Sequence, residues 1–474
     1  MASRMFSRAS ASVRPWEMQP GMEGHSATSI PVSSGSSVTS SFILGFYSTL
    51  LPPIIAPLLC VLLAFQAFAA SLTVTKPEEV GFSAERLKRV HSVVQSHIDA
   101  KDFAGAVTLV ARKGKVVHFE AQGAIDMESG KAMRTDTLFR MASMTKPLTA
   151  VAVLMLMEEG KLVLSDPVSK FIPEFKNPKV AVWNLPNDPR GAGVKLVSGD
   201  REVTLQHILT HTAGLAVTAD GPAGDFFRKS KLDQGGISLA EFSKRSGELP
   251  LNFQPGTQWQ YTGGVGFAVL GRVVEVVSGM NLDQFFKRRI LTPLNMNNTF
   301  FTIPADRMGD VATVYLRTEQ GVKKQSPPAA LPAGVEFFSG AGGLTGTAED
   351  YLQFCQMLLN GGQWNGTRLL SRKSVELMTD NAIGNLNLAN FSETGLTLEQ
   401  NLRGYGFGLG VRVRKSTGAS GWLGSPGDYG WGGAYGTYFW VDPKEQLIGI
   451  VLMSTRVAIV RTEFPNAVYQ ALVD

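Results

Sequence analysis

The apolar and polar positions change period along the chain, and this change predicts a β-rich start, a largely helical middle and a β-rich end. Near the start, residues 106–111 and 116–121 have the composition of strands, and Lys113-Gly114 between them is typical of a hairpin turn. A capped helix is expected before this hairpin, because Ser83 stands just ahead of apolar residues at helical spacing. These are Leu87, Val90, Val93 and Val94.

Longer stretches in the middle of the chain have the period of helices. The first follows residue 143, is apolar on nearly every side and ends at Gly160, so we expect it to lie buried between two layers. Two further helices are predicted over residues 264–279 and 348–359.

Strand patterns return toward the end of the chain and precede one more helix. The predicted strands are 406–413, 438–441 and 447–453, and the helix lies near 464–472. Residues 161–260 and 280–335 show no sustained period and are predicted to be loop-rich, apart from a short helix at 205–209.

Residues 1–69 differ in composition from the rest of the chain. Residues 1–41 are rich in Ser, Gly and Pro, which predicts either disorder or upstream sequence before the true start of the protein. The uncharged stretch after them has a compact apolar core and ends in Ala67-Phe68-Ala69, a small-x-small cleavage site. We therefore predict a secretory signal peptide and an exported domain over residues 70–474, periplasmic or secreted. The alternative is an uncleaved anchor in the inner membrane through residues 42–69.

Composition narrows the class of protein without changing this outline. The 474 residues are 44% hydrophobic and 18% charged, and their net charge of +5 is modest. The sequence has no run of Lys and Arg and no interleaved aromatic and basic stripe, so nucleic acid is not an expected partner. With Cys60 and Cys355 as the two cysteines, a cysteine-based metal site is not expected, and Cys355 is predicted to be a buried thiol on a helix.

The candidate chemistry centres on Ser143 and Lys146, the single Ser-x-x-Lys sequence in the chain. On a helix these positions share one face, so the amine can reach the hydroxyl. A serine needs an adjacent base to become a nucleophile, and a lysine can be that base only if its pKa falls well below about 10.4. Pro147 favours a first helical turn, which places Ser143 at a helix N-terminus that suits a developing oxyanion. The motif alone is weak evidence, because about one such pair is expected by chance.

His207 and His211 lie four positions apart in a predicted helix and the turn after it. A zinc site with this spacing needs a Glu beside the first His and a third ligand, and Ile208 occupies the place of that Glu. We therefore expect hydrogen bonding in a polar turn for both residues, and we expect no metal and no cofactor.

Four segments, taken in order, resemble the motifs of the serine β-lactamase and penicillin-binding superfamily. They are Ser143-x-x-Lys146, Leu209-Thr210-His211-Thr212-Ala213-Gly214-Leu215, Tyr261-Thr262-Gly263 and Trp431-Gly432-Gly433. The likeness covers about residues 76–474 and is greatest to the class C β-lactamase-like esterases, the family VIII carboxylesterases. It implies an α+β fold with an antiparallel sheet, built from both ends of the chain and flanked by helices, and a mostly helical lobe, with the site between them.

The resemblance also implies a role for each motif residue. Ser143 is the nucleophile that becomes acylated, and Lys146 helps to remove its proton. Tyr261 acts with the lysine as general base and later activates the deacylating water. Trp431-Gly432-Gly433 matches the strand that binds substrate, and the backbone N–H groups of Ser143 and Ala434 form the oxyanion hole.

Two positions depart from the pattern of this superfamily. Gly263 replaces the Asn of Tyr-x-Asn, and Trp431 replaces the Lys of Lys-Thr-Gly, so an amide and a cation that meet β-lactams are missing. An uncharged site suits neutral esters better. Aromatic residues that could wall an acyl pocket, or equally belong to the core, are Trp431, Phe337, Phe338 and Tyr435.

The sequence therefore predicts a serine hydrolase that cleaves carboxylic esters with short acyl chains through an acyl-serine intermediate. One alternative is β-lactam hydrolysis, or cleavage of D-amino-acid amides or peptides, at the same residues. Another is a penicillin-binding-like protein that is acylated without turnover. The expected partner is a small ester, and the sequence does not predict an oligomeric state.

Overall fold

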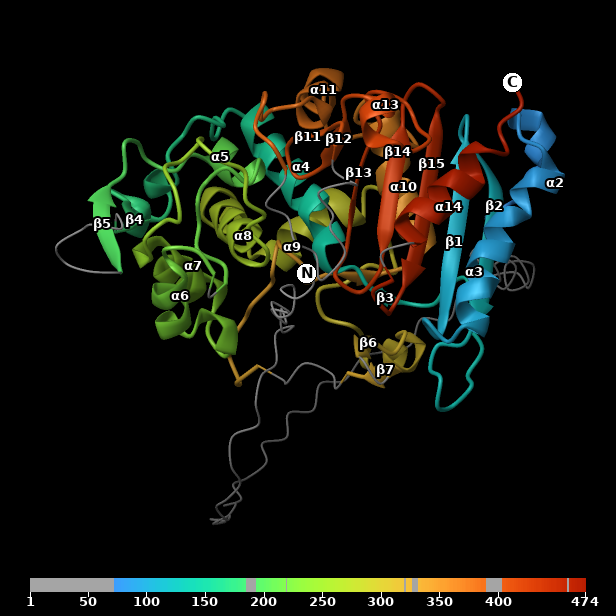
Figure 1. Ribbon diagram of the computed structural model, residues 1–474, viewed down its shortest axis with the longest axis horizontal. Coiled ribbons are helices and arrows are strands. Elements are labelled where there is room, and N and C mark those ends of the chain that lie inside the picture. The colour runs from blue at the N-terminus through green and yellow to red at the C-terminus, as the bar shows by residue number, and fades with distance from the viewer. Residues whose placement is uncertain are drawn as a thin grey trace, which may run out of the picture. The chain divides into compact units, whose positions relative to one another are not determined.

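A seven-stranded antiparallel sheet joins the N-terminal and C-terminal parts of the described chain (Figure 1). The computed structural model describes residues 72–184, 193–218, 220–318, 321–325, 331–388, 403–457 and 460–474. The strand order is β11-β12-β13-β14-β15-β1-β2, so the hairpin β1–β2 pairs with the last strand, β15. The strands are β1 (Gly105–Arg112), β2 (Lys115–Gly123), β11 (Tyr405–Phe407), β12 (Arg412–Arg414), β13 (Tyr429–Gly432), β14 (Tyr438–Asp442) and β15 (Leu447–Met453).

The β1–β2 hairpin confirms the first strand prediction. Lys113 and Gly114 both have positive φ, 51° and 76°, as in the two-residue turns that match the twist of a sheet. Every residue of β1 is buried, because the strand lies between β2 and β15 and beneath helices.

Helices cover both faces of this sheet. On one face, α3 (Arg89–Asp99) and α14 (Val460–Tyr469) share a hydrophobic core with β1, β14 and β15. On the other face lies α10 (Ala348–Leu359), whose Tyr351 ring is 5.0 Å from the ring of Phe439 on β14. Core residues on the α3 and α14 side include Val90, Val94, Val110, Trp440, Val451, Phe464 and Val468.

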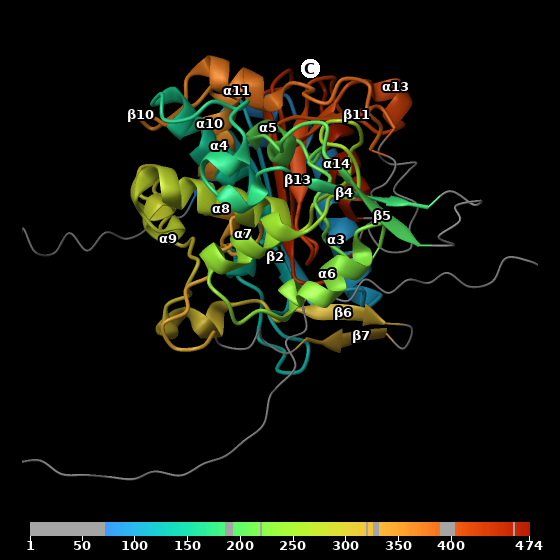
Figure 2. The same cartoon turned by 90° about the vertical axis from the view of Figure 1, so that its left-hand side faces the viewer.

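A second group of helices forms the mostly helical lobe, which Figure 2 shows from the front. Its central helix is α8, which packs against four neighbours. These helices are α8 (Val265–Ser278), α4 (Thr145–Glu158), α5 (Leu205–Leu209), α7 (Leu239–Glu248) and α9 (Leu282–Phe286). Gly271 permits the close approach of α8 and α9, because a Cβ there would lie 2.9 Å from the side chain of Leu282. The predicted α+β fold is confirmed by this sheet and lobe.

Three predictions of secondary structure are wrong in detail. The strand expected at 406–413 is the pair β11 and β12, because Gly410, at φ 79°, turns the chain between them. The last helix, α14, spans Val460–Tyr469 and not the predicted 464–472. The apolar pattern continues to Leu472, but that residue lies outside the helix. The loop-rich prediction missed α7 and the hairpin of β4 (Lys179–Trp183) and β5 (Val194–Ser198) in 161–260. In 280–335 it missed α9 and the hairpin of β6 (Tyr315–Thr318) and β7 (Gly321–Lys324). Large apolar side chains are sparse in α7, which buries Leu239 and Phe242.

The remaining elements are short. They are η1 (Pro77–Val80), α2 (Ala84–Leu87), β3 (Phe139–Arg140), η2 (Ala142–Met144), η3 (Val168–Lys170), η4 (Pro173–Phe175), β4 (Lys179–Trp183), β5 (Val194–Ser198), α6 (Gly224–Ser230), η5 (Leu232–Gln234), η6 (Lys287–Leu291), η7 (Ala305–Asp310), β6 (Tyr315–Thr318), β7 (Gly321–Lys324), β8 (Thr345–Gly346), β9 (Gln363–Trp364), β10 (Thr367–Arg368), α11 (Arg372–Thr379) and α13 (Thr417–Ser420).

The proposed signal peptide lies outside the described residues. Its cleavage, the alternative of a membrane anchor, export and the boundary at residue 70 therefore stay predictions, and Cys60 lies in the same segment. In the described part of the chain, no single helix is long and apolar enough to cross a membrane, and α8 with residues 282–291 passes that test only as a pair bent by 76°. Cys355 is buried on α10, as predicted.

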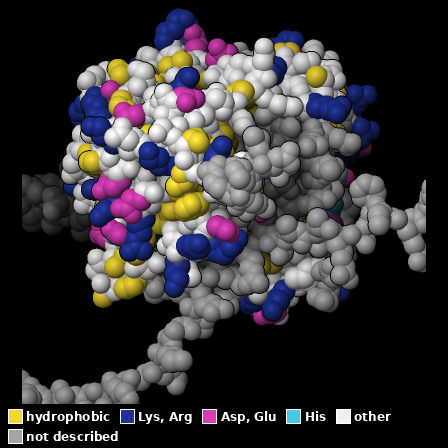
Figure 3. Space-filling model, turned by 60° about the vertical axis from the view of Figure 1, so that its left-hand side comes forward, with side chains coloured by type: hydrophobic (Ala, Val, Ile, Leu, Met, Phe, Trp, Pro, Cys, Tyr) yellow, Lys and Arg dark blue, Asp and Glu magenta, His cyan; other side chains and the backbone are white. Residues whose placement is uncertain are grey.

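The described elements belong to one unit that runs from Val74 to Asp474. On the face drawn in Figure 3, basic and acidic side chains are interspersed over the described surface.

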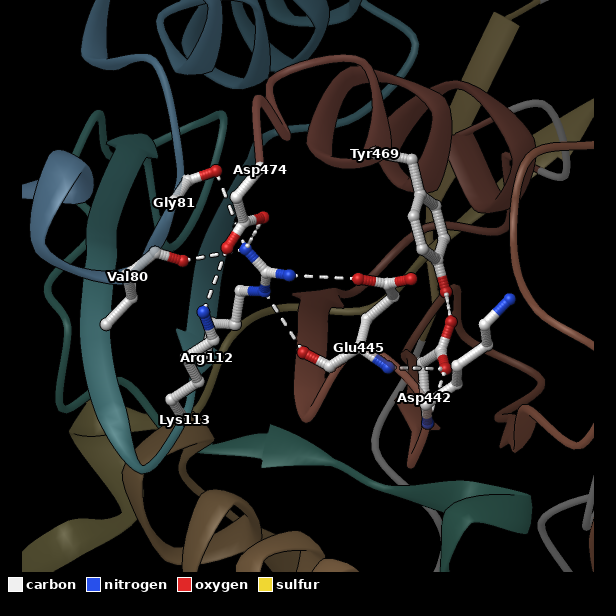
Figure 4. A network of polar contacts seen from close by, with 9 residues as sticks. Val80, Gly81, Arg112, Lys113, Asp442, Glu445, Tyr469 and Asp474 are labelled. Carbon is white, nitrogen blue, oxygen red and sulfur yellow. Dashed lines mark hydrogen bonds and ion pairs between the residues drawn. The ribbon is translucent and has the colours of Figure 1, made fainter.

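The buried side chain of Arg112, on β1, makes hydrogen bonds to three other segments of this unit, at Val80, Glu445 and Asp474 (Figure 4). The guanidinium of Arg112, at the end of β1, donates to the Val80 carbonyl at 2.7 Å and to the Glu445 carboxylate at 2.9 Å. It also donates to the carboxylate of Asp474 and to the backbone carbonyl of Glu445. Because the Arg112 side chain is only 5% exposed, these acceptors replace the water that it loses on folding.

We expect Arg112→Leu to lower the free energy of unfolding by about 2–4 kcal/mol, since it leaves several acceptors without a donor. Arg228→Leu is the matched control. Arg228 pairs with Asp225, and the two side chains are 62% and 69% exposed, so its loss should cost under about 1 kcal/mol. Denaturant unfolding of both variants measures the difference, and equal losses would contradict the structural role of Arg112.

Candidate active site

Ser143 lies in a short 3-10 turn that leads directly into a buried helix. The turn, η2, follows β3, and α4 begins at Thr145, so Ser143-x-x-Lys146 spans the junction of the two helical segments. Ala142 has a positive φ of 45°, which is unusual for a residue with a side chain. Ser143 remains partly exposed, whereas Lys146 is 1% exposed. The serine therefore keeps part of its surface in contact with solvent, and the lysine is enclosed.

The backbone of this turn is held from the α10 side of the molecule. The hydroxyl of Tyr351 donates to the Met144 carbonyl at 2.9 Å. The N–H of Met141 donates to the Leu344 carbonyl at 2.9 Å, and the Leu344 N–H donates to the Thr145 hydroxyl at 3.2 Å. These bonds on both sides of Ser143 fix its position.

The structure brings the three predicted catalytic side chains together. The Lys146 ammonium donates to Ser143 Oγ at 3.0 Å, and the Tyr261 hydroxyl donates to the same oxygen at 2.6 Å. The Lys146 nitrogen also lies 5.1 Å from the centre of the Tyr261 ring. Tyr261 comes from the turn before α8, which packs against α4, so helix packing sets this geometry.

A backbone carbonyl that the sequence analysis did not identify completes the surroundings of Lys146. The carbonyl of Ala341 accepts from the Lys146 ammonium at 2.8 Å, and the Phe267 ring lies 5.8 Å from that nitrogen. The segment 339–343, which carries this carbonyl, is closely packed. A Cβ on Gly340 would lie 2.6 Å from the Phe267 carbonyl. Every residue type has a carbonyl, so side-chain identity gave no signal for this acceptor.

The end of β13 packs directly against the Ser143 turn. A Cβ on Gly433 would lie 2.4 Å from the Met141 carbonyl and 3.3 Å from the Ala142 Cβ, so only glycine permits this approach. The Thr437 hydroxyl donates to the same Met141 carbonyl at 3.2 Å. Ala434, the next residue, is exposed at this junction.

Trp431 and Gly432 face opposite sides of the sheet. The Trp431 ring is 7% exposed and lies 5.4 Å from Tyr261 and 5.2 Å from Phe407, so the position of the missing lysine holds a buried indole. On the other side, the guanidinium of Arg461 from α14 lies against Gly432 and donates to the Gly433 carbonyl. This cation could not be predicted from the sequence, because no local pattern shows that α14 packs against the end of β13.

The other candidate residues lie in different surroundings. Gly263 has a positive φ of 50°, and a Cβ there would contact nothing within 4 Å. Phe338 packs 5.7 Å from Phe301, and Phe337 packs 5.2 Å from Phe242. Burial raises the pKa of Tyr435, and the nearby Arg140 opposes this rise.

The two histidines make hydrogen bonds, as predicted. His207 Nδ1 accepts from the Thr204 N–H at 3.2 Å, which closes a capping box at the start of α5. His211 Nδ1 lies 2.8 Å from the Thr262 hydroxyl. Burial and the neighbouring Lys146 hold the pKa of His211 well below its usual range, so the ring is neutral. No group of three or more His, Cys, Asp or Glu residues suited to a metal occurs among the described residues.

The amino-acid sequence matches one known protein family over most of its length. The family described as beta-lactamase matches residues 90–472. The chain belongs to the beta-lactamase family. This finding confirms the resemblance to the serine β-lactamase and penicillin-binding superfamily, whose members are serine hydrolases.

Three known proteins are among those similar to this beta-lactamase family chain. Protein Rv1367c of Mycobacterium tuberculosis is 36% identical over 336 residues, 69% of this chain and 79% of that protein. Esterase EstB of Burkholderia gladioli is 33% identical over 291 residues, 57% of this chain and 69% of that protein. A putative D-alanyl-D-alanine carboxypeptidase of Salmonella agona is 28% identical over 430 residues, 83% of this chain and 89% of that protein.

Among solved structures, EstCE1, a hydrolase with promiscuous acyltransferase activity, matches with a TM-score of 0.66 and 27% identity. The match covers 82% of this chain and 99% of EstCE1.

Proposed function

We propose that this protein hydrolyses carboxylic esters with short acyl chains through an acyl-serine intermediate. The observation that supports this proposal is the convergence of two proton-carrying groups on one oxygen. Ser143 Oγ accepts from Lys146 at 3.0 Å and from Tyr261 at 2.6 Å. A nucleophile within hydrogen-bond reach of its base is what acyl transfer requires.

In the first step, Ser143 Oγ attacks the ester carbonyl carbon, and the carbonyl π electrons move onto its oxygen. The Ser143 proton passes to Tyr261, which must then be in its phenolate form. The Lys146 ammonium favours that form, because a cation close to a phenol stabilises the negative charge.

The oxyanion formed in this step needs preorganised donors. We assign this role to the backbone N–H groups of Ser143 and Ala434. The assignment is supported by the close packing of Gly433 against Met141 and Ala142, which brings the end of β13 to the Ser143 turn. Donors fixed by backbone packing cost no reorganisation during the reaction.

The tetrahedral intermediate then collapses. The bond between the carbonyl carbon and the alcohol oxygen breaks, and the leaving alkoxide takes the proton from Tyr261. In the second half, water attacks the acyl carbon and gives a proton to the Tyr261 oxygen. The bond between the acyl carbon and Ser143 Oγ then breaks, Oγ takes that proton from Tyr261, and the carboxylic acid is released.

The substrate class follows from what surrounds the nucleophile. Trp431 buries an indole where a lysine would offer a charge, and Gly263 offers no side-chain amide. Both features favour a neutral ester over a β-lactam. The similarity to EstB and EstCE1 supports the same choice, while the similarity to the Salmonella carboxypeptidase keeps D-amino-acid amides and peptides as the alternative.

Ser143→Ala should lower kcat for p-nitrophenyl butyrate by about 1000-fold or more, because no acyl-enzyme can form. It should also abolish labelling by a fluorophosphonate. Ser92→Ala, at an exposed position on α3, is the control and should behave as wild type. Ester turnover that persists in Ser143→Ala would remove Ser143 from the mechanism.

Tyr261→Phe should lower kcat by about 100-fold to 10,000-fold, since it removes the group that accepts and returns the proton. Tyr469→Phe is the matched control, because its hydroxyl also makes a hydrogen bond, to Asp442 at 2.7 Å, but on the far side of the sheet. Steady-state kinetics on both variants measures the effect. A near-normal rate for Tyr261→Phe would assign the base role to Lys146 alone.

The wild-type enzyme should turn over p-nitrophenyl butyrate with a kcat/KM at least about 100-fold above that for a chromogenic cephalosporin or a D-alanyl-D-alanine peptide. Each carboxylate substrate meets a site whose strand offers an indole in place of an ammonium. Parallel initial-rate measurements on the three substrates test this. A preference for the cephalosporin or the peptide would replace the ester in our proposal.

A further inference from the structure

The side chain of His211 packs against the ring of Tyr261. Its side chain is 0% exposed, and its backbone φ of 59° is in the left-handed region that a residue with a side chain rarely adopts. The imidazole lies 4.8 Å from the Tyr261 ring at an interplanar angle of 65°, an edge-on contact. A strained backbone in a fully buried position needs strong support from its surroundings.

Hydrogen bonds join His211 to the residues on both sides of Tyr261. The N–H of Gln260 donates to the His211 carbonyl at 2.9 Å. The N–H of Thr262 donates to His211 Nδ1 at 3.2 Å, and the Thr262 hydroxyl lies 2.8 Å from the same nitrogen. The segment that carries Tyr261 is therefore held at two points by a single residue.

The Thr262 N–H also fixes the tautomer of the ring. A backbone N–H can only donate, so Nδ1 is an acceptor and the proton of the neutral imidazole lies on Nε2. Nε2 is buried and has no hydrogen-bond partner among the described residues. The ring is surrounded instead by Trp259, Phe267, Phe407 and Trp431 at centroid distances of 5.8, 5.3, 5.0 and 6.4 Å. These aromatic rings favour the uncharged form, which adds no second positive charge beside Lys146.

We infer that His211 is a positioning residue for Tyr261. Its Nδ1 and its carbonyl hold residues 260–262, and its ring packs against the phenol ring, so that the Tyr261 oxygen stays at 2.6 Å from Ser143 Oγ. This inference rests on the proposed acyl-serine chemistry. It assigns His211 no contact with substrate and no part in proton transfer.

Three substitutions separate the acceptor at Nδ1 from the volume of the ring. His211→Asn retains an acceptor near the place of Nδ1, His211→Gln moves it to the place of Nε2, and His211→Phe retains the ring alone. We expect kcat for p-nitrophenyl butyrate to fall about 100-fold in the Phe and Gln variants, because a misplacement of about 1 Å in a catalytic group has that effect. The Asn variant should stay within about 10-fold of wild type, with KM nearly constant in all three.

The pH profile of kcat/KM is a second readout. The midpoint should shift in His211→Phe and His211→Gln, because the phenol no longer lies beside Ser143 and Lys146. In His211→Asn the midpoint should equal that of wild type. Matched controls are His207→Asn and His207→Phe, since His207 Nδ1 also accepts a backbone N–H but caps α5 instead. Equal kcat values for His211→Asn and His211→Gln would overturn the inference. So would a His211→Phe variant whose pH profile and kcat per folded enzyme are those of wild type. If Phe does not fold, the comparison of Asn with Gln decides.

The rate of Ser143 labelling by a fluorophosphonate makes the result independent of the substrate. If wild type is labelled but hydrolyses no ester, the proposed substrate fails, and slower labelling in the Gln variant than in Asn still supports the positioning role. Equal labelling of all variants would overturn the positioning role while leaving ester hydrolysis intact. A wild-type protein that is not labelled would overturn both.

Discussion

Burial of the Lys146 ammonium is the constraint on which the arrangement of the site depends. Removing such a cation from water costs several kcal/mol unless acceptors and aromatic faces replace the solvent. Here Ser143 Oγ and the Ala341 carbonyl accept its protons, and the rings of Tyr261 and Phe267 lie against it. The compensation of one charge thus requires α4, α8 and the loop before α10 to meet at one point, which is also where the reaction would occur.

Much of the fold could be predicted because its main elements have a clear period. The β1–β2 hairpin, the buried helix α4 and the strand β15 follow directly from apolar spacing and turn residues. The split of β11 from β12 could not, because it depends on how Gly408 and Gly410 pack against distant segments. A Cβ on Gly408 would lie 2.2 Å from the Met378 carbonyl, and one on Gly410 would lie 3.2 Å from Ala150. Such contacts leave no local pattern.

Some residues of the candidate site could be predicted from the sequence, and others could not. Ser143, Lys146 and Tyr261 could be named from the sequence because their side chains form an ordered set of motifs, although each motif alone is weak. The Ala341 carbonyl, the Arg461 guanidinium beside Gly432 and the role of His211 behind Tyr261 could not. They depend on backbone atoms, on the packing of the helix α14 against the end of β13, and on a ring whose sequence context predicts an ordinary polar turn.

The order of strands in the sheet has a consequence for biosynthesis. β1 and β2 are translated well before β15, yet the edge of β1 that faces β15 has no partner strand until Leu447–Met453 has been made. Until then, an apolar strand with an open hydrogen-bonding edge is exposed to self-association, and the nascent chain cannot assemble its reactive centre. A truncated or stalled polypeptide would carry both the serine and the lysine while remaining inert. Pairing of that early hairpin with β15 is therefore as much a requirement for an assembled site as the catalytic residues themselves.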